Sequence, residues 1–284
     1  MYRFLALLGV VDLEHPLTYN ELKRLPVFRY QNAAKAFSLF GGLEFAFTLP
    51  GCWIPFIHWL WRIPTILASA TMISREVEQR TWAPLRTTPF SVREIVYAKY
   101  AAIFYYMEPY VMLVIYIRAV PVIIFGASWM VSALTILPQR GLEYWFTITA
   151  ALLMAGVYVL LSPVLDVAVD GAVGILASTM APRRSTTLVI AMLARLTGWL
   201  LPLALAAPLQ YGAFTDLWSG TPPDMITLRA VAVVSTFGPG YAFLWGVPAW
   251  LSVGLVIGFI LGRLGLVRLL LEFTVIRAAR IETL

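Results

Sequence analysis

Ionisable side chains inside long apolar stretches are the residues of this sequence best placed to do chemistry. Asp166 and Asp170 are four positions apart, so they would share one face of a helix. Two carboxylates in a membrane could bind a cation or cleave a peptide bond. Aspartyl proteolysis needs its aspartates on separate, facing helices, and Asp170-Gly171 is a poor match to its glycine motif. We therefore favour pairing with a base such as Arg195, or a wet cavity near the cytoplasmic end. The full set of such residues is His58, Arg62, Glu108, Asp166, Asp170 and Arg195.

Other patterns that could support catalysis or metal binding are weak. Cys52 and His58 are six positions apart in one expected helix, and the sequence has no HExxH or CxxC motif. Ser128 follows Gly126-Ala127 but lacks the second glycine expected of a rhomboid-like serine, and no histidine is an evident partner for it. We therefore expect no enzyme site, no metal and no cofactor in this chain.

The composition predicts an integral membrane protein. Of the 284 residues, 60% are hydrophobic and only 13% are charged, against about 25% charged residues in an average soluble domain. This excludes a disordered, collagen-like, disulfide-stabilised or freely cytosolic chain. The net charge of +6 does not indicate nucleic-acid binding, because most bases fall in short stretches between apolar runs.

The spacing of apolar runs predicts about six membrane-spanning helices. A hydrocarbon core of about 30 Å needs roughly 20 helical residues. Basic residues cluster at 3–35, 75–99, 183–184 and 263–280, and all four clusters should be cytoplasmic. An even number of crossings must then separate neighbouring clusters, which makes 119–137 an external, partly embedded segment and requires a first span before 52–73. The expected spans are 31–50, 52–73, 97–117, 144–165, 188–209 and 241–262.

The chain is expected to form one all-α, polytopic membrane domain over residues 1–284, with both termini cytoplasmic. Residues 1–30 form a cytoplasmic or interfacial N-terminal segment, in which 1–11 resembles an interfacial helix more than a signal peptide. Residues 31–73 form the first helical hairpin, 74–96 a cytoplasmic segment, and 97–262 the other four spans. The tail 263–284 carries arginines along an apolar helix, as expected of a segment lying on an anionic leaflet.

The cytoplasmic segment 74–96 has the most specific pattern. A charged helical turn starts at Arg75, and Val77, Thr81 and Leu85 follow at helical spacing, so this face could dock on a partner. The helix should end near 85–87, because Pro89 disfavours helical geometry in the residue before it. Ser91 and Glu94 then fit a capping box that starts a helix entering the bilayer.

This segment resembles the coupling helix of ABC type-2 transporter permeases. Two positions depart from the family pattern, since Arg80 and Ala98 stand where the family usually has glycine. A looser resemblance covers 15–24, 172–184 and 237–241. The resemblance implies an N-terminal interfacial helix, a cytoplasmic coupling helix and a re-entrant external segment before the last span. The matching residues are Glu76, Glu78, Thr81, Leu85, Thr88, Pro89, Ser91, Glu94, Ile95, Val96 and Lys99.

The resemblance also implies a function and partners. The chain would be the permease subunit of an ATP-driven exporter in a bacterial-type plasma membrane, working with a second permease copy or paralogue. None of its lysines follows a glycine, so it has no phosphate-binding loop, and ATP and Mg are expected in a separate ABC ATP-binding subunit. The alternative is a non-transporting scaffold or accessory subunit of a membrane complex. The expected docking residues for the ATPase are Glu76, Glu78, Thr81, Leu85, Thr88, Pro89 and Glu94.

Overall fold

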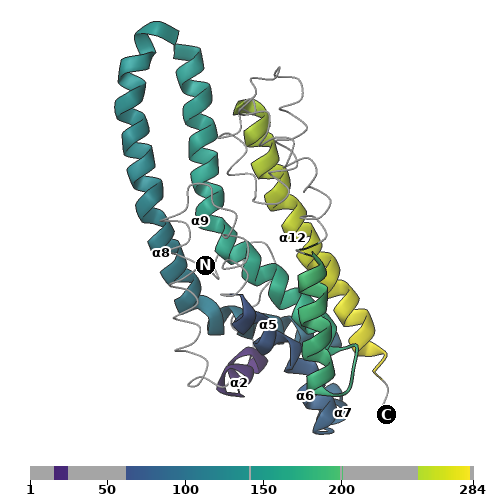
Figure 1. Ribbon diagram of the computed structural model, residues 1–284. Helices are drawn as coiled ribbons and strands as arrows, with labels where there is room; N and C mark the ends of the chain where they lie inside the picture. The colour runs from purple at the N-terminus through teal and green to yellow at the C-terminus, as the bar shows by residue number, and fades with distance from the viewer. Residues whose placement is uncertain (1–15, 25–61, 141, 199, 201–248, 282–284) are drawn as a thin grey trace. The chain divides into compact units, whose positions relative to one another are not determined.

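The computed structural model describes residues 16–24, 62–140, 142–198, 200 and 249–281, and within these ranges all regular structure is helical. This confirms the all-α expectation for the described part of the chain. Residues 184–198 also form a helix. The named helices are α2 Pro16–Arg24, α5 Ile63–Ala70, α6 Met72–Glu78, α7 Trp82–Arg86, α8 Val92–Arg140, α9 Leu142–Ser178 and α12 Ala249–Ala279 (Figure 1).

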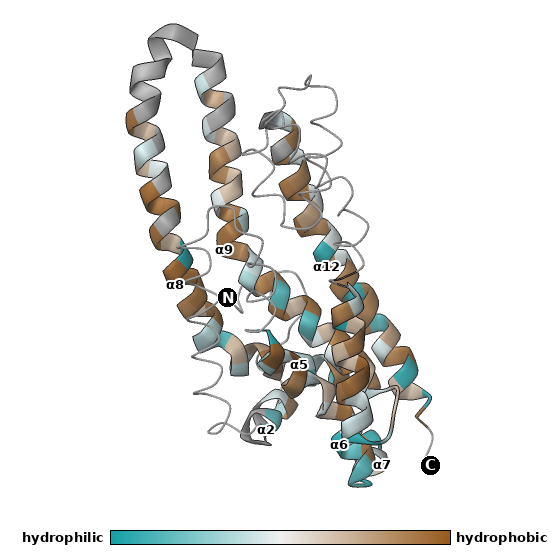
Figure 2. Cartoon of the chain, in the orientation of Figure 1, coloured by the Kyte–Doolittle hydropathy of each residue, from teal (hydrophilic) through white to brown (hydrophobic). Residues whose placement is uncertain are grey.

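Among the described residues, three helices are long and apolar enough to cross a membrane: Val92–Ser128, Thr149–Ser178 and Val253–Ala279. Figure 2 shows the apolar residues that dominate these stretches. The chain is therefore a helical membrane protein. These helices contain the expected span 97–117 and overlap those at 144–165 and 241–262. Several expected elements lie outside the described residues. They are the span 31–50, residues 52–61 of the span 52–73, residues 201–209 of the span 188–209, and the segments 1–11 and 237–241.

Two of the long helices continue beyond the limits expected from the sequence. Residues 119–137 are part of α8, which runs unbroken to Arg140, rather than a separate external segment. The tail from Arg263 to Ala279 likewise continues α12 across Gly262. A helix bonds all its backbone groups internally, which is the favourable solution in a hydrocarbon environment and here outweighs the prolines and glycines at these positions.

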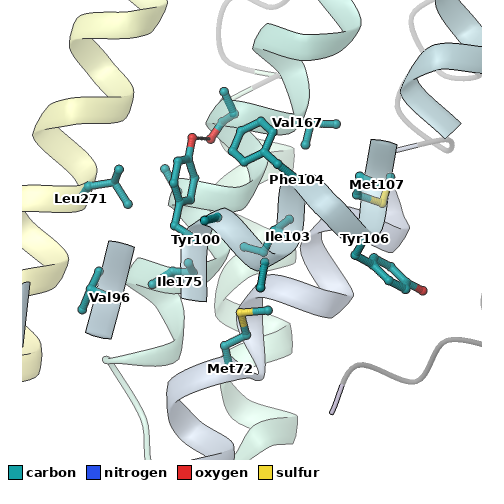
Figure 3. Packing of buried hydrophobic residues seen from close by; sticks show 14 of the residues in the cluster. Met72, Val96, Tyr100, Ile103, Phe104, Tyr106, Met107, Val167, Ile175 and Leu271 are labelled. Atoms are coloured by element: carbon teal, nitrogen blue, oxygen red, sulfur yellow. Dashed lines mark hydrogen bonds between the residues drawn. The ribbon is translucent and has the colours of Figure 1, made fainter. Parts of the chain in front are cut away.

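The chain forms two compact units. The first comprises residues 1–115, 163–195 and 263–284, and the second comprises 116–162 and 196–262. The core of the first unit is built from α6, α8, α9 and α12 (Figure 3). Tyr100 and Phe104 pack edge to face there with ring centroids 5.0 Å apart, and the Tyr100 hydroxyl donates to the Ala168 carbonyl at 2.9 Å. Central members of this core are Met72, Val96, Tyr100, Ile103, Phe104, Met107, Val167, Ile175 and Leu271.

Close contact between α5 and α9 in the first unit depends on a glycine. A Cβ atom on Gly174 would lie 1.8 Å from Ser69 Oγ and 3.0 Å from the backbone nitrogen of Ala70. The Ser69 hydroxyl is itself held by the Thr65 carbonyl at 2.7 Å. The absence of a side chain at position 174 thus lets the two helices approach.

The second unit contains a buried arginine that bonds a backbone carbonyl of α9. Pro163 has no backbone N–H, so the carbonyl of Val159 loses its usual helical donor. Arg118 donates to this carbonyl at 3.4 Å and to Ser162 Oγ at 2.7 Å, and the Ser162 hydroxyl donates to the same carbonyl at 3.1 Å. Side chains therefore replace the missing backbone bond.

Candidate functional site

The segment between α5 and α8 consists of two short helices rather than the single helix expected. α6 ends at Glu78, and Arg80 adopts a left-handed backbone conformation with φ of 59°. The backbone N–H of Thr81 bonds the Glu76 carbonyl at 2.8 Å, and that of Arg80 bonds the Val77 carbonyl at 3.0 Å. These two bonds form a Schellman motif, which stops α6 and lets α7 start at Trp82. Arg80 thus occupies a position that favours glycine.

The capping box at the start of α8 is confirmed. The backbone N–H of Ser91 donates to the Glu94 carboxylate at 2.6 Å, and the Glu94 N–H donates to Ser91 Oγ at 3.2 Å. The turn before it, which includes Pro89, is held by the Thr88 hydroxyl, which donates to the Leu85 carbonyl at 2.6 Å. Local hydrogen bonds therefore fix the junction between α6 and α7 and the end of the segment next to α8.

The outer surface of this segment and of the first turn of α8 carries four of the expected docking residues. Glu78, Thr81, Pro89 and Glu94 are exposed, and we call them the docking face. Glu78 pairs with Arg184 at 2.7 Å, where the chain begins the helix at 184–198.

The apolar residues of the segment face the protein itself, which corrects the expectation of an apolar docking stripe. Val77 and Leu85 pack against the core of the first unit, and Trp82 is buried. Thr88 is half-buried. Val77 and Leu85 lie on different helices, α6 and α7, because Arg80 interrupts the expected single helix, and Thr81 between them is exposed.

Glu76 is also directed inward, in contrast to its expected role in docking. It is 2% exposed, and its carboxylate lies 3.4 Å from Lys99 Nζ and 3.7 Å from Arg75. It also accepts a hydrogen bond from the Thr81 hydroxyl. Lys99 bonds Glu21 at 2.6 Å, and Arg75 bonds Glu21 at 3.0 Å.

We call Glu21, Arg75, Glu76 and Lys99 the lysine cluster. It joins α2, α6 and α8 inside the first unit. Buried charges are stable only when paired, so these contacts fix α6 against α8. The role of Glu76 is therefore to hold the segment in place. Lys99 is named in the sequence only as a match to the permease pattern; its buried position could have been predicted, because Val96, Lys99 and Ile103 share the buried side of α8 at helical spacing.

The two aspartates singled out from the sequence lie in a second buried cluster of ion pairs. Asp170 is fully buried and binds Arg62 through Nε at 2.6 Å and Arg195 at 2.5 Å. Asp166 lies 3.3 Å from Arg62 and 2.5 Å from Arg263. The expected pairing with Arg195 is thus observed, and Arg62 and Arg263 are further partners. We call these five residues the aspartate cluster.

The aspartate cluster connects α9 to three other parts of the first unit: the residue preceding α5, the helix at 184–198, and α12. Each of the two carboxylates is engaged by two guanidinium groups, which argues for a structural role. The sequence does not indicate Arg263 as a partner of Asp166, because the two residues are 97 positions apart and Arg263 starts the expected tail segment. Glu108 lies half-buried on α8.

Within the described ranges, no group of three or more His, Cys, Asp or Glu side chains could hold a metal ion. Comparisons with protein-family models, curated proteins and solved structures found no match to this chain. The functional argument therefore depends on the geometry of the residues described above.

Proposed function

We propose that this chain is the membrane-spanning permease subunit of an ATP-driven ABC exporter in a plasma membrane. A separate subunit would bind ATP and Mg and dock on the exposed face of the α6–α7 segment. The docking face would be cytoplasmic, as would both termini. A second permease copy or paralogue would complete the translocation pathway.

The observation that carries this proposal is the attachment of the α6–α7 segment to α8. The inner side of the segment is held by an ion pair and by apolar contacts, while its outer side is exposed. A Schellman motif fixes the junction between α6 and α7, and a capping box fixes the start of α8, so the segment resists deformation. Glu76 connects it to Lys99 on α8, and Val77 and Leu85 pack on the core. A displacement of a docked partner would therefore move α8 rather than deform the segment.

The lysine cluster supports this mechanism because it adds a second attachment. Glu21 of α2 binds both Lys99 of α8 and Arg75 of α6. Three helices are thereby connected by charged groups that are costly to separate in a buried site. We infer that α2, α6 and the lower part of α8 move together when the partner binds or hydrolyses ATP.

The experiment is a gentle detergent extraction of the tagged chain from its native membrane, followed by mass spectrometry and an ATPase assay. The proposal predicts that a second protein with a phosphate-binding loop is recovered in a stoichiometric amount and that the recovered complex hydrolyses ATP. Recovery of membrane proteins alone, with no ATPase, would favour the alternative of a scaffold or accessory subunit.

A further inference from the structure

The C-terminal half of α12 exposes a row of large apolar side chains. Leu266, Leu269, Phe273 and Ile276 are 44%, 60%, 58% and 50% exposed. Their spacing of three, four and three residues places them along one face of the helix. The row lies in the stretch Val253–Ala279, which is long and apolar enough to cross a membrane. Acyl chains are thus a suitable covering for this face.

Basic side chains follow directly at the end of this row. Arg277 and Arg280 are exposed, and neither side chain has a carboxylate partner among the residues that the structure describes. Arg86 of α7 is also exposed and donates to the Ile281 carbonyl at 3.3 Å, which places α7 beside the end of α12. By contrast, two other arginines of this unit are matched by carboxylates: Arg93 by Glu272 and Arg184 by Glu78.

We propose that Arg86, Arg277 and Arg280 bind the headgroup of an anionic phospholipid whose acyl chains lie along the apolar row of α12. Guanidinium groups bind phosphate through charge-assisted hydrogen bonds. Basic residues next to an anionic leaflet attract it electrostatically. Along this face of α12 the exposed side chains are first apolar and then basic. A phospholipid has the same order, with acyl chains followed by a phosphate.

This site extends beyond the proposed transporter function and does not depend on it. Because Arg86 belongs to α7, a bound lipid would hold α7 against the end of α12. The lipid would therefore stabilise the same segment that carries the docking face. An acidic protein surface could pair with the arginines but would leave the adjoining apolar row uncovered, so the lipid is the better fit.

The test measures thermal unfolding of the full purified chain in detergent with added phosphatidylglycerol or phosphatidylcholine. We expect phosphatidylglycerol to raise the melting temperature and phosphatidylcholine to have little effect. The double variant Arg277→Gln/Arg280→Gln should lose most of this increase. Arg268→Gln is the matched control, because Arg268 is an exposed arginine on a different face of α12, and it should keep the increase.

A salt titration of the unchanged chain makes the test independent of how the variants fold. Salt screens exposed charges, so the advantage of phosphatidylglycerol should fall steeply between low and high ionic strength. The proposal is overturned if both lipids act equally, if the advantage is insensitive to salt, or if the double variant responds like the unchanged chain. It is also overturned if the double variant keeps its lipid response but loses a protein partner, since the arginines would then serve protein docking.

Discussion

At the scale of single residues, opposite charges account for the ionisable groups in the core of the first unit. Asp170 forms ion pairs with Arg62 and Arg195, and Lys99 forms ion pairs with Glu21 and Glu76. A buried ion pair contributes little net stability compared with apolar packing, but removal of one partner leaves the other charge uncompensated. The aspartates are therefore essential to the fold without any need for them to react.

Replacement of Asp170 tests this role. Asp170→Ala removes the carboxylate that pairs with Arg195 and leaves Arg62 only its contact with Asp166, and we expect a loss of about 3–5 kcal/mol in stability. Glu78→Gln is the comparison, because its exposed pair with Arg184 should contribute no more than about 1 kcal/mol. Thermal unfolding of the purified proteins measures both. Equal melting temperatures for the two variants would contradict a structural role for the aspartate cluster.

Arg80 offers a test in the opposite direction. A left-handed conformation costs a residue other than glycine about 1–2 kcal/mol, so Arg80→Gly should raise stability, by up to about 1 kcal/mol after the entropy cost of glycine. Gln79→Gly, at a neighbouring position with negative φ, should lower it. An increase in melting temperature for Arg80→Gly alone is the expected outcome, whereas a decrease would argue against the Schellman motif.

At the scale of helices, close packing rather than charge sets the position of α5 on α9. A methyl group on Gly174 would overlap Ser69 and reach the backbone of α5. We expect Gly174→Ala to destabilise the protein by about 1–3 kcal/mol, as overpacking does. Gly258→Ala is the control, because its added methyl group meets nothing within 4 Å. If both variants unfold at the same temperature, this would contradict the close contact between α5 and α9 at Gly174.

Features that depend on neighbouring residues could be predicted from the sequence, whereas most features that depend on distant ones could not, the pairing of Asp170 with Arg195 being the exception. The capping box at Ser91 was predicted because Glu94 is only three residues away. The inward position of Glu76 depends on Lys99 and Glu21, which are 23 and 55 positions from it in sequence. The pattern of Val77 and Leu85 predicted one helix, and it revealed neither the break at Arg80 nor that both residues pack on the core of this chain.

At the scale of the whole molecule, composition and periodicity predicted a helical membrane protein, and the described helices agree. The lengths of α8 and α12 were underestimated because the expected boundaries followed changes in charge, whereas a helix in an apolar environment continues to satisfy its backbone. The expected six spans and cytoplasmic termini stay predictions.

The central claim is that an ATPase docks on the exposed side of the α6–α7 segment. Glu78 is the most informative position, because its carboxylate is exposed and has one charged partner that can be changed separately, Arg184. A reversal of charge at Glu78 should prevent docking without disturbing the core. The double variant Glu78→Lys/Arg184→Glu restores an ion pair within the chain but keeps the altered charge on the docking face.

The most direct measurement is therefore ATPase activity recovered with the tagged chain from native membranes, compared among four forms of the protein. We predict that Glu78→Lys and the double variant Glu78→Lys/Arg184→Glu insert normally but recover little ATPase activity, whereas Arg184→Glu resembles the unchanged chain. Full recovery with Glu78→Lys would contradict docking at this face. Recovery restored by the double variant would show that Glu78 acts only through its pair with Arg184, which would also contradict the claim.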